Sequence, residues 1–319
     1  MADFLLLEGQ RGVPALGDHV SIQTTLLCPV DFSPLSRGAL HYALAIARRF
    51  HARLVVQTVD DPLLSEVGDT RLGDGWSRAN SELQLRAMVG EAESGFTPAD
   101  VVYDVRIGKA APHILEAARD HDCALIVMST HGRSGAGKFF FGATAERVLR
   151  ETTLPVLLAP KDPGALPFEE LARQASPMLV PVDFSAATAH QVAMAGRIAG
   201  LLHLRVMIGH VVERVDGPEP FPLNEGDLLS ERYRHACRGL QSIAVGVPIP
   251  VAPEILITSG VPAEEIARWV REKDVGLLLM ALHSGGGGIP RMGSATYRAI
   301  ALSRMLTLAL PPAAGVIRE

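Results

Sequence analysis

The pentapeptide Pro29-Val-Asp-Phe-Ser33 occurs a second time as Pro181-Val-Asp-Phe-Ser185, 152 positions further along the chain. The same offset relates four further pairs: Gly108 and Gly260, Ile114 and Ile266, Met128 and Met280, and His131 and His283. A register kept over so long a distance indicates one domain duplicated in tandem. The length of 319 residues also suits two domains. We therefore expect domains over residues 22–160 and 177–311, joined by a linker over residues 161–176.

The composition predicts a soluble cytoplasmic protein. Hydrophobic residues make up 48% of the chain and charged residues 20%, which supports a substantial core in each half. The net charge of −5 is mild and the basic residues are scattered, so no nucleic-acid partner is expected. No apolar run reaches the roughly 18 residues that a membrane span needs, so no membrane partner is expected either. The three cysteines, Cys28, Cys123 and Cys237, lack C-x-x-C spacing and are expected to be reduced, buried thiols.

Strands and helices alternate along each half. Ser33-Pro34 is typical of a helix start, with an N-cap serine and proline at the first helical position, and apolar residues at helical spacing predict a helix over residues 34–50. The first half has predicted strands over residues 24–30, 54–59, 101–107, 124–128 and 155–159, and further helices over 77–94, 111–120 and 144–151. The second half repeats this order. The alternation implies an α/β fold with a parallel sheet covered on both faces.

Two loops at the carboxyl ends of the predicted strands are candidates for a binding site. One is the turn after the first strand, which contains Asp31 in the first half and Asp183 in the second. The other is the Gly-rich segment 129–144. Its glycines would let backbone amides approach a phosphate, and the helix that begins near Thr144 would offer free N–H groups to that anion. The carboxylate of Asp31 would suit ribose hydroxyls. Alternatively, Asp31 only caps its turn and the glycines only shape a loop.

No arrangement of residues typical of catalysis or of a metal site is found in the sequence. The segment Gly132–Lys138 satisfies G-x-x-x-x-G-K, but Phe139 stands where a P-loop has its Ser or Thr. His131 and His283 have no carboxylate or second histidine at metal-ligand spacing. We therefore expect no metal site, no catalytic residues and at most trace ATP hydrolysis.

The motifs resemble those of the universal stress protein family in its tandem two-domain form. The matching segments are Pro29-Val-Asp-Phe-Ser33, Leu125-Ile-Val-Met-Ser-Thr-His-Gly-Arg-Ser-Gly135, Phe141-Gly-Ala-Thr-Ala-Glu-Arg-Val-Leu149 and Leu154-Pro-Val-Leu-Leu158. The resemblance implies two tandem five-stranded parallel-sheet domains of adenine-nucleotide α-hydrolase-like (Rossmann-like) topology. Family members pair domains through edge strands, so residues 155–159 and 306–310 are expected to join the two halves as an intramolecular pseudo-dimer.

The resemblance also implies an adenine-nucleotide site in the first half. ATP-binding members share a loop G-x2-G-x9-G-[ST]. Gly132 and Gly142 fit its second and third glycines, whereas Ser129 replaces the first glycine and Ala143 the final Ser or Thr. A hydroxyl for the phosphate is therefore lost unless Thr144 supplies it.

The remaining contacts that the resemblance implies lie on the nucleoside. Asp31 matches the acid that contacts adenosine, and the purine-side positions are matched by Pro29, Val30, Val59 and Met128. The second half is expected to be the weaker site. It keeps Asp183 and Val211, but Ala281 and Ser284 replace two loop glycines and only eight residues precede its Gly293-Ser294 end.

We therefore expect a stress-response regulator that binds ATP or another adenine nucleotide in domain 1, with Mg²⁺ only as the counterion of the nucleotide. One alternative is an interaction scaffold of the same family that binds no nucleotide, and another is a weak ATPase or nucleotidyl transferase. A regulatory protein partner fits the first two functions. The sequence leaves open whether two chains associate further as a homodimer.

Overall fold

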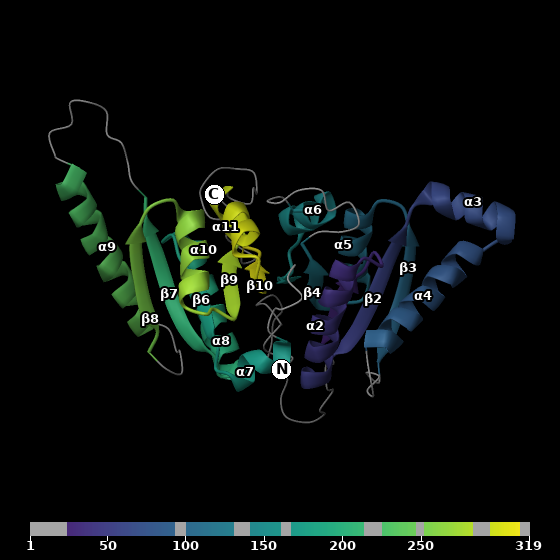
Figure 1. Cartoon of the computed structure of the whole chain (residues 1–319), viewed down its shortest axis with the longest axis horizontal. Coiled ribbons are helices and arrows are strands. Elements are labelled where there is room, and N and C mark those ends of the chain that lie inside the picture. Colours follow the sequence, from purple (N-terminus) through teal and green to yellow (C-terminus); the bar gives the residue numbers. More distant parts are fainter. Residues whose placement is uncertain are drawn as a thin grey trace, which may run out of the picture. The chain divides into compact units, whose positions relative to one another are not determined.

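Each half of the chain folds around five parallel strands, as the sequence predicts (Figure 1). The computed structural model describes residues 24–92, 100–130, 141–160, 167–213, 225–246, 252–282 and 294–312. The chain divides into two compact units, Met1–Pro163 and Gly164–Glu319. How the units pack against each other stays a prediction, and each is described by itself.

Unit 1 has the strand order β3-β2-β1-β4-β5. Its elements are β1 (Thr25–Pro29), α2 (Pro34–Phe50), β2 (Arg53–Asp60), α3 (Pro62–Leu72), α4 (Trp76–Ala92), β3 (Val101–Ile107), α5 (Ala110–Asp120), β4 (Cys123–Ser129), α6 (Ala143–Glu151) and β5 (Val156–Ala159). All neighbouring strands are parallel, and the register sets Thr25 of β1 beside Arg53 of β2 and Cys123 of β4.

Unit 2 repeats this order as β8-β7-β6-β9-β10. Its elements are α7 (Phe168–Arg173), β6 (Pro177–Pro181), α8 (Ala187–Leu202), β7 (Arg205–Val212), α9 (Glu225–Gly246), β8 (Glu254–Ser259), α10 (Pro262–Glu272), β9 (Leu277–Ala281), α11 (Ser294–Ser303) and β10 (Thr307–Leu310). The strands again pair in parallel. The order expected from the family resemblance is therefore confirmed in both units.

Helices form two groups on each sheet. In unit 1, α2 packs beside α4 on the strands, and α5 packs beside α6. The central strands β1 and β6 are buried along nearly their whole length. Continuous burial is typical of parallel strands that are covered on both faces. The polar ends of these strands are therefore the places where the sheet meets solvent.

The duplication is visible in the backbone as well as in the sequence. Residues with positive φ recur at the offset of 152: Phe32 and Phe184 at 62° and 58°, His51 and His203 at 51° and 55°, Asp122 and Asp274 at 48° and 49°, and Gly108 and Gly260 at 140° and 151°. Positive φ is uncommon for residues other than glycine. Its recurrence at matched positions shows that both copies keep the same turns after β1, α2, β3 and α5 and their counterparts.

Three helices depart from the sequence-based expectation. Helix α3 lies in a segment expected to be a polar loop, and α7 lies in the expected linker. Helix α9 stands where the repeated order places a helix, but no residue range was predicted for it. Helix α7 is held by packing, because Phe168 and Leu171 are buried and a Cβ on Gly276 would lie 2.7 Å from the Leu171 side chain.

The two units fill one matched core position differently. In unit 1, Gln57 of β2 is fully buried, and its Nε2 donates to the carbonyl of His113 at 3.0 Å. In unit 2 the equivalent residue is Gly209, and the indole of Trp269 occupies the space, so a Cβ on Gly209 would lie 2.6 Å from the ring. The residue of unit 1 that matches Trp269 is Ala117. In unit 1 the large side chain thus comes from the strand and the small one from the helix, whereas in unit 2 the large side chain comes from the helix.

A glutamine supports the point in unit 2 at which the strand order reverses. Strands β6 and β9 pair only at Met178 and Leu179. Beyond these residues, the buried Gln191 of α8 donates from Nε2 to the carbonyls of Pro181 and Leu279, both at 2.9 Å. Where these two strands separate, the Gln191 amide thus takes the place of the backbone hydrogen bonds that would otherwise join them.

Two of the three cysteines are buried, as expected. Burial raises the pKa of Cys123 to about 12 and holds the pKa of Cys28 well above its usual range, so both thiols stay protonated at neutral pH. Cys237 is half-buried on α9. In the part of the chain that the structure describes, no helix combines the length and apolar character of a membrane span.

We expect Gly209→Ala to lower the free energy of unfolding by about 1–3 kcal/mol, because its Cβ would overlap the Trp269 ring. In a Trp269→Ala background the same change should cost much less, which a double-mutant cycle with urea denaturation measures. The matched control is Gly38→Ala in α2, where a Cβ meets nothing within 4 Å. Equal losses at Gly209 in both backgrounds would contradict this account of the packing.

We expect Gln191→Met to destabilise the protein by about 2 kcal/mol, because it removes the donor to the buried carbonyl of Leu279 and to the half-buried carbonyl of Pro181. Methionine keeps the length of the side chain, so the loss isolates the amide. The control is Gln241→Met on the exposed side of α9. Denaturation monitored by circular dichroism compares the two, and a loss no greater than that of the control would show that the amide does not support the strand ends.

Candidate functional site

The repeated pentapeptide forms the same turn in both units. In unit 1 the N–H of Val30 donates to the carbonyl of Gln57 at 2.8 Å, and the N–H of Ser33 donates to Oδ1 of Asp31 at 3.1 Å. In unit 2 the matching distances are 2.8 Å, from Val182 to Gly209, and 2.9 Å, from Ser185 to Asp183. Both carboxylates therefore do cap their turn. The capping uses Oδ1 and holds the carboxylate at the carboxyl end of the central strand.

The helices that follow these turns begin differently. Ser33 caps α2, because its side chain accepts from the N–H of Ser36, and Pro34 starts the helix. Helix α8 begins one residue later relative to the repeat, at Ala187, and its N-cap Ala186 offers no side-chain hydrogen bond. The capping pattern of the repeated motif is thus retained in unit 1 and lost in unit 2.

The described candidate residues of unit 1 all lie at one edge of the sheet. Pro29 ends β1, with Val30 and Asp31 directly after it. Val59 is the penultimate residue of β2, and Met128 and Ser129 end β4. Gly142 is the N-cap of α6, and Ala143 and Thr144 begin that helix. The N–H of Gly142 donates to the carbonyl of Thr130 at 2.9 Å, which joins the helix start to the end of β4. Gly132 lies outside the described residues.

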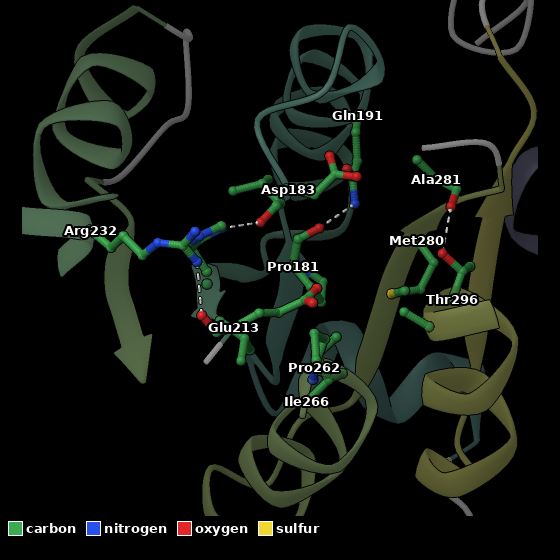
Figure 2. Close-up of a pocket in the computed structure, with 15 residues that line it drawn as sticks. Pro181, Asp183, Gln191, Glu213, Arg232, Pro262, Ile266, Met280, Ala281 and Thr296 are labelled. Carbon is green, nitrogen blue, oxygen red and sulfur yellow. Dashed lines mark hydrogen bonds between the residues drawn. The ribbon is translucent and has the colours of Figure 1, made fainter. Parts of the chain in front are cut away.

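The structure shows a cavity of about 540 Å³ at the matching edge of unit 2 (Figure 2). It lies beyond the ends of β6, β7 and β9 and beside the starts of α10 and α11. The lining residues are Pro181, Val182, Asp183, Gln191, Gly209, His210, Val211, Glu213, Arg232, Pro262, Ile266, Met280, Ala281, Ala295 and Thr296. Asp183 and Val211 were predicted. Ser294 is the first residue of α11, and Gly293 lies outside the described residues.

The floor of this cavity is apolar and its rim is polar. Val182, Val211 and Met280 are buried strand-end residues. The rim carries the carboxylates of Asp183 and Glu213 and the guanidinium of Arg232, whose Nη1 donates to the carbonyl of Glu213 at 3.0 Å. Figure 2 shows Arg232 reaching from α9 toward Glu213. A flat apolar group with polar substituents at its edge would match these walls.

His210 lines the cavity and is held on two sides. Its Nδ1 lies 2.8 Å from the carbonyl of Val182, which can only accept, so Nδ1 carries the proton. The imidazole also contacts the ring of Phe184, with 4.5 Å between centroids. Unit 1 has Thr58 at this position, so the aromatic wall belongs to unit 2 alone.

The start of α11 forms the remaining wall. Ala295 and Thr296 lie in its first turn, where backbone N–H groups have no partner within the helix. The hydroxyl of Thr296 donates to the carbonyl of Ala281 at 3.4 Å and so links the helix to the end of β9. In unit 1 the start of α6 is joined to the end of β4 by a different bond, from the backbone N–H of Gly142 to the carbonyl of Thr130.

Five lining residues with polar side chains escaped the sequence-based prediction: Gln191, His210, Glu213, Arg232 and Thr296. Gln191 had a usable signal, because a long amide within an otherwise apolar helix face indicates a structural hydrogen bond. His210 could have been found as the residue before Val211. Arg232 carried no local signal, since α9 reaches the cavity only through tertiary packing.

A family model described as the universal stress protein family matches residues 24–160 and 175–305. A universal stress protein from Methanocaldococcus jannaschii is 29% identical over 140 residues, which cover 43% of this chain and 81% of that protein. A solved structure of a functionally unknown protein from Pseudomonas aeruginosa PAO1 has a TM-score of 0.60 at 17% identity, covering 91% of this chain and 93% of that one.

A universal stress protein from Archaeoglobus fulgidus DSM 4304 has a TM-score of 0.57 at 18% identity, covering 91% of this chain and 96% of that one. At these identities the solved structures show a shared fold. The family model matches most of the chain in two tandem regions, and both regions have the same strand order and the same Pro-Val-Asp-Phe-Ser turn. The chain therefore belongs to the universal stress protein family and carries two domains of that family in tandem.

Proposed function

We propose that this protein is a cytoplasmic stress-response regulator that binds an adenine nucleotide at the carboxyl ends of its strands. Nucleotide binding would act by altering how the protein associates with itself or with a regulatory partner. The cavity of unit 2 carries this proposal, because it combines an apolar floor, an acidic rim and a helix start around about 540 Å³. Ligand pockets commonly enclose about 300–1,000 Å³.

Each part of a nucleotide has a matching surface. The purine would lie on Val182, Val211 and Met280, whose side chains form the apolar floor. The ribose hydroxyls would donate to the carboxylate of Asp183, which the turn already holds in place through Oδ1. The phosphates would meet the N–H groups of the first turn of α11, where the helix dipole favours negative charge. Mg²⁺ would enter only as the counterion of those phosphates.

The same proposal extends to unit 1. Pro29, Val30, Asp31, Val59 and Met128 match the lining residues Pro181, Val182, Asp183, Val211 and Met280 at the offset of 152. The loop that retains Gly132 and Gly142 favours unit 1 as the tighter site. The cavity favours unit 2. An experiment must therefore distinguish nucleotide binding in one unit from binding in both units.

We expect titration of the protein with labelled ATP to show saturable binding, weakened about 10- to 100-fold in one site by Asp31→Ala and in the other by Asp183→Ala. The reason is the loss of a charge-assisted hydrogen bond to ribose, worth about 1.5–3 kcal/mol. The double variant should be weakened to the same extent at both sites. Asp74→Ala, an exposed residue between α3 and α4, serves as the control.

Circular dichroism of each variant would establish that it is folded, because the carboxylates also cap their turns. Wild-type protein without saturable binding at millimolar ATP would contradict the nucleotide proposal. That result would favour the second candidate, an interaction scaffold of the same fold. This candidate is motivated by the replacement of loop glycines by Ser129, Ala281 and Ser284, and of the final Ser or Thr by Ala143.

We expect steady-state assays with Mg²⁺ and ATP to detect at most trace phosphate release. General-base catalysis needs a side chain poised to take a proton from water. Around the cavity of unit 2, Oδ1 of Asp183 accepts from Ser185, and Nδ1 of His210 donates to Val182. Turnover well above background that disappeared in Asp31→Ala or Asp183→Ala would instead identify an ATPase.

A further inference from the structure

Helix α4 of unit 1 carries a row of apolar residues on the side that faces away from its sheet. Its buried side consists of Ser77, Ser81, Leu85, Met88 and Val89. The opposite side consists of five exposed residues, here called the α4 stripe: Trp76, Ala79, Leu83, Ala87 and Gly90. Leu83 is 66% exposed and Trp76 is 41% exposed. A surface helix normally presents charged and polar residues at these positions.

The matching helix of unit 2 shows that the fold does not require such a stripe. Helix α9 also follows the second strand of its unit and packs on β7 and β8. Its outer side exposes Glu231, Arg234 and Arg238, and the carboxylate of Glu231 forms ion pairs with both arginines. The duplication therefore provides an internal comparison, and only α4 has an apolar outer side.

A second exposed apolar group adjoins one end of the stripe. Leu63, Leu64 and Val67 of α3 are 68%, 72% and 45% exposed. The Trp76 ring packs against α3, since a Cβ on Gly68 would lie 3.4 Å from it. Several large apolar side chains gathered on one surface are typical of a site that binds another protein.

The stripe is complementary to itself when its direction is reversed. Its members are spaced three, four, four and three residues apart, which reads the same from either end. When two copies of α4 are placed antiparallel with Leu83 against Leu83, Ala79 faces Ala87 and Trp76 faces Gly90. The largest side chain thus meets the smallest one. The space above Gly90 is open, because a Cβ there meets nothing within 4 Å.

The charges beside the stripe support the same arrangement. Glu82 and Arg86 lie on one flank and form an ion pair at 2.7 Å. In the antiparallel pairing, Glu82 of one copy comes within one helical turn of Arg86 of the other. Each carboxylate would then lie between two guanidinium groups. A two-fold interface of this kind is closed, because each copy uses the same surface.

We propose that a second copy of this chain packs on the α4 stripe as an antiparallel helix pair, about a two-fold axis that passes Leu83. A helix of 17 residues spans about 25 Å. A single pair of such helices lies at the low end of stable interfaces, near 1,200 Å² or below. The dimer should therefore dissociate in the micromolar range.

Sedimentation of the full chain over about 1–100 µM tests this proposal. Wild type should shift from monomer to dimer. Leu83→Glu, which places two carboxylates at the axis, and Gly90→Leu, which fills the space for Trp76, should each weaken the dimer at least tenfold. Both positions are exposed, so neither change disturbs the fold. Val245→Glu, at an 88% exposed position on α9, is the control and should dimerise as wild type does.

Cross-linking tests the direction of the helices. Leu83→Cys in a Cys237→Ser background should form a disulfide-linked dimer on mild oxidation, because the axis brings residue 83 next to its copy. Gln241→Cys in the same background, exposed on α9, should not. A wild-type monomer at every concentration, a dimer that Leu83→Glu leaves intact, or no cross-link at residue 83 would each overturn the proposal.

Discussion

The reversal of strand order at the first strand of each unit is the constraint on which the rest of the structure depends. Strand β1 pairs with β2 on one side and β4 on the other, and β6 does the same with β7 and β9. The connections that leave these neighbours diverge, so a crevice opens at the carboxyl ends of the strands. The cavity of unit 2 lies at this place, and Gln191 closes the gap beneath it.

The duplication preserved this backbone and exchanged the side chains that fill it. The positive φ values of Phe32 and Phe184 differ by only a few degrees, so the turn that presents the aspartate is the same in both units. Around it, Gln57 of unit 1 is replaced by Gly209 of unit 2, and the missing volume is supplied by Trp269. Because Gly209 has no side chain, it leaves room for the indole of Trp269 and also lines the cavity.

The sequence predicted those helix boundaries that are set by capping residues close by in the chain. The predicted helix 34–50 coincides with α2, because Ser33 and Pro34 specify its start and His51 ends it in the left-handed conformation. Helix α3 also begins with an Asp61-Pro62 capping pattern, but only Ser65 is buried, so it lacks the apolar periodicity that signals a core-facing helix. The strand-end positions of the candidate site follow from topology and could be predicted. Arg232 could not, because a contact between α9 and the end of β7 depends on tertiary packing.

The helix after the second strand shows how one position in the fold can serve two purposes. In unit 1 the short side chain of Ser81 binds Asp60 at the end of β2, at 2.7 Å, which draws α4 close to the strand. In unit 2 the long side chain of Arg232 reaches Glu213 just beyond β7, so α9 stands at the far side of the cavity and forms its wall.

Arg232 of helix α9 thus lines the cavity, whereas α4 is bound to the end of β2 by the Ser81 hydroxyl and turns an apolar side to solvent. If both proposals hold, the nucleotide site of unit 2 and the association surface of unit 1 share no residues. A ligand could then bind in unit 2 without competing for the α4 stripe. The tandem chain would divide ligand binding and self-association between two helices, whereas a single domain would have only one helix at this position for both.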